Sequence, residues 1–244
     1  MSNAVDHPRI VERLLAHGVD PAVRSLSPTS PSRLTPLDRA LRKSNMETVK
    51  LLLAQPKVLV SFPECGSMLW VSAASCPEAL PLLAAAGLDL SLVPAYYALA
   101  AATRRQQPQA IEFFLAALPF IKPDEENDLE FAQYKTLGVA LIGNSASPQM
   151  AALLWKSFPK DSEVLPRLDE KGSSLLHLAA QSQCDPQIIQ DLIDHGLSPT
   201  QANLEGKTPK DLATPEASAV FAAHQAKCLG EQTPLASGPP RPRF

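Results

Sequence analysis

Glycine, aromatic residues and cysteine are all scarce in this chain, and each shortage excludes a class of protein. The 244 residues include 10 glycines and 24 prolines. This balance argues against a glycine-rich nucleotide-binding fold and favours many short elements with stiff connections. Aromatic residues make up 5% of the chain, while alanine and leucine dominate, as in closely packed helices. The 4 cysteines are far apart and form no CxxC motif, so we expect a reducing compartment without disulfides.

The chain also lacks a strong charge bias and a long apolar run. Its formal net charge is -3, so the composition does not indicate nucleic-acid binding. The longest apolar stretches are interrupted by proline, glycine and aspartate, which predicts no membrane span. The N-terminus does not read as a secretory signal. We therefore expect a cytoplasmic protein, with delivery to a host or target cell as the alternative if the chain is an effector.

Motifs for cofactor chemistry and catalysis are missing as well. The sequence contains no GxxxxGK[ST], GxSxG or HExxH motif and no zinc-deaminase signature. The acidic run DEENDLE at 124–130 lacks the alternation and turn glycine of a calcium loop, so a solvated loop is favoured. We predict no cofactor, no metal and no catalytic residue.

What the chain does contain is a recurring helix–turn–helix unit. Residues 172–200, GSSLLHLAAQSQCDPQIIQDLIDHGLSPT, read as a turn, a short helix, a break, a second helix and a closing turn. Thr208 takes the position of Ser174 in the next unit, and Thr35 and Met68 open two earlier units. HPRIVERLLAHGVDPA, near the start, is the second half of a further unit.

The middle of the chain is less regular. Ala95 and Lys135 take the same position in two units of uneven spacing, separated by loops at 121–133 and 159–170. Such insertions are tolerated on one face of a stacked array.

The second helices carry an apolar stripe that one helix pair cannot bury, so neighbouring units must stack on it. Glycines after these helices, such as Gly87 and Gly196, predict left-handed helix ends. The two clearest stripes comprise Ile10, Val11, Leu14 and Leu15, and Ile188, Ile189, Leu192 and Ile193.

Several segments together resemble the ankyrin-repeat protein family. They are TPLDRA at 35–40, GSSLLHLAA at 172–180, GKTPKDLA at 206–213, and HGVDP and HGLSP at 17–21 and 195–199. The resemblance implies an all-α fold, an α-solenoid of stacked ankyrin-like helix–turn–helix repeats. The repeat domain would cover 1–227, with about six to seven units, the first partial and 95–170 irregular. Residues 228–244 read as a disordered proline-rich tail.

The resemblance also implies a function, namely binding a partner protein through a concave face made by the turn tips and the ends of the first helices. We expect a monomer whose protein partner is unidentified, with no nucleic acid and no membrane involved. The candidate partner-binding residues are Arg33, Arg42, Lys43, Ser75, Arg104, Arg105, Lys171, Gln181 and Lys207. The same register adds Leu34, Glu64, Ser67, Cys76, Glu170, Ser173, Ser182, Leu204 and Glu205, with Tyr96, Tyr97 and Trp70 as aromatic anchors, although Trp70 also suits the core.

The sequence positions of three histidines, His177, His17 and His195, indicate structural roles. His177 lacks carboxylates or cysteines at ligand spacing, so we interpret it as a ring that hydrogen-bonds the neighbouring turns, as the resemblance implies. His17 and His195 precede glycines at helix ends, where a partly cationic ring is favourable. Three functions stay open: a non-enzymatic adaptor or inhibitor, a bacterial effector or immunity-type protein that blocks a target, and, least favoured, an enzyme on a helical scaffold.

Overall fold

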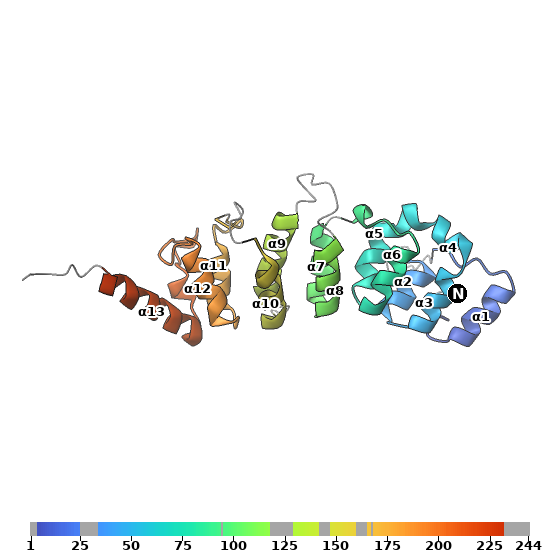
Figure 1. The fold of residues 1–244 in the computed structure, drawn as a ribbon, viewed down its shortest axis with the longest axis horizontal. Coiled ribbons are helices and arrows are strands. Elements are labelled where there is room, and N and C mark those ends of the chain that lie inside the picture. Colours follow the sequence, from blue (N-terminus) through green and yellow to red (C-terminus); the bar gives the residue numbers. More distant parts are fainter. Residues whose placement is uncertain are drawn as a thin grey trace, which may run out of the picture. The chain divides into compact units, whose positions relative to one another are not determined.

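The computed structural model of the chain describes residues 4–24, 34–93, 95–117, 129–141, 147–159, 165–166 and 168–231. Within these residues all regular structure is helical (Figure 1), which confirms the predicted fold class. The α-helices are α1 (Pro8–Ala16), α2 (Pro36–Arg42), α3 (Met46–Leu53), α4 (Pro56–Val60), α5 (Phe62–Ala73), α6 (Leu80–Ala85), α7 (Ala95–Arg104), α8 (Pro108–Ala117), α9 (Leu129–Leu141), α10 (Pro148–Ser157), α11 (Leu175–Gln181), α12 (Pro186–Asp194) and α13 (Pro215–Glu231). Short 3₁₀ helices are η1 (Pro77–Ala79), η2 (Leu90–Leu92) and η5 (Lys210–Leu212).

The chain forms two compact units, Met1–Pro159 and Lys160–Phe244. In the first unit α2 packs on α3, α7 on α8 and α9 on α10. The first helices α2, α5, α7 and α9 contact one another in chain order, while α1 contacts α3 and α8 contacts α10. In the second unit α11 packs on α12, and α13 packs on both. Each unit is therefore a stack of helix pairs, as the apolar stripes require.

Capping boxes start two of the first helices, α2 and α11, where the motif predicts them. Thr35 Oγ1 accepts a hydrogen bond from Asp38 N, and the Asp38 carboxylate accepts one from Thr35 N in return. The N-cap of α11 is Ser174, with His177 in the place of the aspartate. The second helices end as predicted at Gly87 and Gly196, whose φ angles are 88° and 91°. Only glycine adopts this left-handed conformation without strain.

The apolar stripe of α12 is buried as predicted, because Ile188, Ile189, Leu192 and Ile193 all lie in the core. The stripe of α1 is not, since only Val11 is buried and Ile10 is 48% exposed.

Several boundaries differ from the expected ones. A short helix, α4, precedes α5, and α5 begins at Phe62, so Met68 lies inside the helix that we expected it to open. Phe62 is buried, and this apolar contact accounts for the earlier start. Likewise α9 begins at Leu129, within the expected loop, and ahead of Lys135.

The last unit also departs from the repeat pattern. Its first helix is reduced to the 3₁₀ turn η5, because Pro215 already begins the next helix. That helix, α13, continues to Glu231, past the expected tail boundary at residue 228; the rest of the tail, 232–244, lies outside the described residues.

Candidate partner-binding surface

Two pairs of cationic residues occupy equivalent positions at the ends of first helices. Arg42 and Lys43 end α2, and Arg104 and Arg105 end α7. Each pair precedes a residue with a φ of 52°, Ser44 after the first pair and Gln106 after the second. The backbone therefore leaves both helices in the same way. Because α2 and α7 both pack on α5, equivalent positions on them share one face of the first unit.

A buried aspartate orients Arg42 through the neighbouring repeat. Asp38 is 1% exposed, and its carboxylate accepts hydrogen bonds from Thr35 N, Thr35 Oγ1 and Ser72 Oγ at 3.0, 2.9 and 3.1 Å. Ser72, on α5, in turn accepts a hydrogen bond from Arg42 Nε at 3.2 Å. This chain of bonds leaves the two Nη groups of Arg42, the outer fork of the guanidinium, to face a ligand.

In the α7 pair, Arg105 is held by its own helix. Arg105 Nη1 donates to the carbonyl of Ala101 at 3.3 Å. Burial lowers the pKa of the half-buried Arg105 guanidinium, and the positive charges of Arg42 and Arg104 lower it further. Arg105 nevertheless stays protonated, because an arginine pKa lies far above neutrality.

Lys43 and Ser75 have partners within the first unit. Lys43 Nζ lies 3.5 Å from Asp6 Oδ2, in an exposed ion pair. The carbonyl of Ser75 accepts a hydrogen bond from Ser44 Oγ at 2.8 Å, which ties the end of α2 to the end of α5. The remaining first-unit candidate, Arg33, lies outside the described residues, as does the side chain of Ser67.

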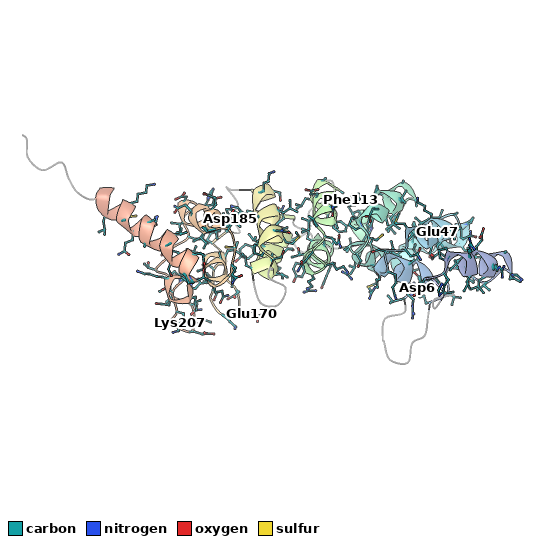
Figure 2. The ribbon with its side chains drawn as sticks, turned by 90° about the horizontal axis from the view of Figure 1, so that it is seen from below. Asp6, Glu47, Phe113, Glu170, Asp185 and Lys207 are labelled. Carbon is teal, nitrogen blue, oxygen red and sulfur yellow. The ribbon has the colours of Figure 1, made fainter. Side chains whose placement is uncertain are left out.

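The candidates of the second unit cluster at its turns. Leu204 N donates to the carbonyl of Lys171, and His177 Nε2 lies 3.2 Å from the carbonyl of Lys207, so consecutive turns are joined. The side chains of Lys171, Lys207 and Gln181 are exposed. Figure 2 shows Glu170 and Lys207 on one side of the second unit and Asp185, the N-cap of α12, on the other.

Several residues of the expected surface register are buried instead. Ser173 accepts a hydrogen bond from Asn203 Nδ2, and Ser182 donates to the carbonyl of Ala179. Cys76 is enclosed beside Met46. These side chains bond or pack within the protein, where they join neighbouring repeats or end a helix. The repeat register alone does not show that they are buried.

The aromatic candidates divide between core and surface. Trp70 is fully buried, donates to the carbonyl of Asp89 at 2.9 Å and packs on Phe113 and Phe114. It therefore belongs to the core. Tyr97 is 60% exposed, and Tyr96 lies against both Tyr97 and the ammonium group of Lys135, which is 5.6 Å from its ring centre.

The histidines take the structural positions expected of them. Because His177 Nδ1 accepts from Ser174 N, its proton resides on Nε2, which donates to the Lys207 carbonyl. His17 Nδ1 and His195 Nδ1 each lie within hydrogen-bonding distance of the carbonyl four residues earlier.

Three of the four cysteines, Cys65, Cys76 and Cys184, are buried. Burial raises the pKa of the Cys65, Cys76 and Cys184 thiols, which makes them poor nucleophiles at neutral pH. In the described part of the chain, no three acidic, histidine or cysteine side chains gather to bind a metal ion. Nor does any helix there have the length and apolar character needed to cross a bilayer.

Stacked helix pairs, with capping boxes at the start of α2 and α11 and left-handed glycines after α6 and α12, define an α-helical repeat protein. Comparison with solved structures identifies the repeat: the chain has the ankyrin-repeat fold. It is similar to the human ASB11 ankyrin repeat domain, with 20% identity, 98% of each chain covered and a TM-score of 0.58. The ankyrin repeat domain of Bcl-3, described as a member of the IkappaB protein family, is 17% identical, with 91% of this chain and 96% of that chain covered and a TM-score of 0.51.

A weaker likeness is to a structure of the Bd0816 predatory endopeptidase from Bdellovibrio bacteriovorus in complex with the immunity protein Bd3460. It has 21% identity, covers 81% of this chain and 97% of that chain, and has a TM-score of 0.49, which is too low to support an inference. No protein-family model and no curated protein matches the sequence.

Proposed function

We propose that the chain is a non-enzymatic module that binds a partner protein through the ends of its first helices and the adjoining turns. In each of the two units we call this surface the first-helix face. The observation that carries the proposal is the bonding of Arg42 to Ser72 and of Ser72 to Asp38. A buried carboxylate is costly unless it is fully hydrogen-bonded, and here its bonds hold an exposed arginine at the surface.

The stacked fold supports the proposal physically. In a repeat array the core holds the helix pairs together, while residues at helix ends and turns are free to meet a ligand. Arg42, Arg104, Lys171 and Lys207 are exposed at such positions. Binding through them requires neither a cofactor nor a reactive group.

Purification of the tagged full chain from its native cells, followed by mass spectrometry, tests the proposal. The comparison is between wild type, the variant Arg42→Glu with Lys171→Glu, and the control Lys50→Glu with Lys156→Glu. Both variants change the net charge equally, and the control lysines are exposed on the second helices α3 and α10.

A stoichiometric partner that is lost only from the first variant supports the first-helix face. One dominant partner would indicate an inhibitor, and several partners would indicate an adaptor. A partner lost equally from both variants, or a turnover activity of the purified chain, would contradict the proposal.

A further inference from the structure

Three guanidinium groups on the first-helix face of the first unit, those of Arg42, Arg104 and Arg105, form no ion pair with the described residues. The ion pairs found in the described residues, Arg24 with Glu64 and Lys43 with Asp6, use none of Arg42, Arg104 and Arg105. The three charges are near enough to one another that Arg42 and Arg104 act on the pKa of Arg105. Like charges held together destabilise the unbound fold, and an anion placed among them removes that repulsion.

Two of the three groups, those of Arg42 and Arg105, are also positioned before any ligand arrives. Arg42 is bonded through Nε to Ser72, and Arg105 is half-buried with Nη1 on the Ala101 carbonyl. Ordering flexible side chains on binding is costly, so side chains that are already ordered bind more tightly. Cations are favourable at helix C-termini, which explains why each pair lies at the end of its own helix. It does not explain the bond that directs Arg42 onto α5.

The spread of the three groups indicates what kind of anion they fit. Packed helix axes lie about 8–10 Å apart, so α2 and α7, on either side of α5, are separated by roughly 16–20 Å. The bond to Ser72 directs Arg42 onto α5, so its guanidinium lies closer to α7 than the axis of α2 does. An extended peptide advances about 3.3–3.6 Å per residue, so up to about six residues cover this distance.

We propose that Arg42, Arg104 and Arg105 bind an acidic segment of the partner protein, with carboxylates several residues apart pairing with the two helix ends. This inference rests on the proposed function, because it names the chemistry of the partner for the same face. Each guanidinium fork matches one carboxylate in a bidentate pair. Carboxylates spaced along a peptide can pair with the arginines of both α2 and α7, whereas one compact phosphate cannot reach both helix ends equally well.

The test uses a fluorescently labelled hexaglutamate peptide, with binding to the full chain followed by anisotropy at low and at physiological salt. The arginine variant is Arg42→Gln, Arg104→Gln and Arg105→Gln. Its matched control, Lys50→Gln, Lys57→Gln and Lys156→Gln, removes the same charge from exposed positions elsewhere. Since wild type carries a net charge of -3, net charge alone does not attract the peptide.

We expect the arginine variant to weaken hexaglutamate binding by at least about tenfold and the control by less than about twofold. Circular dichroism checks that both variants fold. If the triple variant does not fold, Arg104→Gln alone replaces it, because this exposed side chain forms no hydrogen bond with the described residues. Lys156→Gln alone then serves as its control.

Equal losses in variant and control, or no binding to wild type at low salt, would overturn the inference. So would a peptide carrying one phosphoserine that binds through the arginines more tightly than hexaglutamate, since a compact dianion would then be the ligand. If the partner purified from native cells binds the arginine variant as well as wild type, the acidic-segment inference fails, while the proposed interaction function stands.

Discussion

Replacing Leu192 with alanine tests whether the second unit depends on the buried stripe of α12. Leu192 is 0% exposed, and α12 packs on both α11 and α13. The substitution removes three buried carbons, worth about 2.4 kcal/mol at about 0.8 kcal/mol each. The cavity that remains increases the loss to about 3–4 kcal/mol.

Hydrogen exchange measured by mass spectrometry locates this effect. A loss of about 3 kcal/mol corresponds to exchange about 100-fold faster in peptides from α11 and α12 when they exchange by unfolding of the unit. Tryptophan fluorescence follows the first unit separately, because Trp70 and Trp155, the two tryptophans of the chain, both lie there.

The control is Leu204→Ala, which removes the same atoms from a side chain in the same unit that is 80% exposed. It should change stability by no more than about 0.5 kcal/mol. If α12 exchanges no faster in Leu192→Ala than in Leu204→Ala, the stripe is not the core of this unit and the reasoning fails.

Three further substitutions test other contacts. His177→Ala removes the bond to the Lys207 carbonyl and leaves a buried donor unmet, so the urea midpoint should fall by the equivalent of about 2–3 kcal/mol; lost turnover with unchanged stability would instead support catalysis. The pKa of Asp211 is lowered by hydrogen bonds from Thr208, so its stabilisation is present above the ordinary aspartate pKa of about 3.9 and lost as the pH falls through the lowered value. Asp211→Asn should therefore flatten the fall of the urea midpoint between about pH 5 and pH 2, and an unchanged slope would contradict this. Phe221→Ala should cost about 3 kcal/mol in thermal unfolding, whereas Leu229→Ala, at an exposed position of α13, should be neutral; equal effects would mean that α13 does not pack as described.

The parts of the fold that could be predicted from sequence are those set by local chemistry. Ser174 and Thr35 cap the helices that follow them, and Gly196 ends α12, because these preferences depend on the neighbouring backbone alone. The early start of α5 at Phe62 could not be predicted, because the burial of Phe62 in the folded chain decides it.

The candidate surface was predicted less well, for a related reason. A repeat register tells which positions point outward, but not which of these side chains are hydrogen-bonded or covered by a neighbouring repeat. Ser173 and Ser182 are therefore buried, and Ser72, which orients Arg42, was not recognised as part of the site. A small polar residue on a first helix, one repeat after an aspartate in the capping box, is the signal that could have identified it.

The bond between Asp38 and Ser72 limits how the array can be rearranged. Repeats in a solenoid are often treated as exchangeable modules, because each contacts only its neighbours. Here the repeat that contains α2 depends on a hydroxyl supplied by the repeat that contains α5. A repeat inserted between them without a hydroxyl at the position of Ser72 would leave part of the buried carboxylate unsatisfied, at a cost of about 1–3 kcal/mol. Lengthening this chain by duplication therefore requires copying the α5 repeat together with its serine.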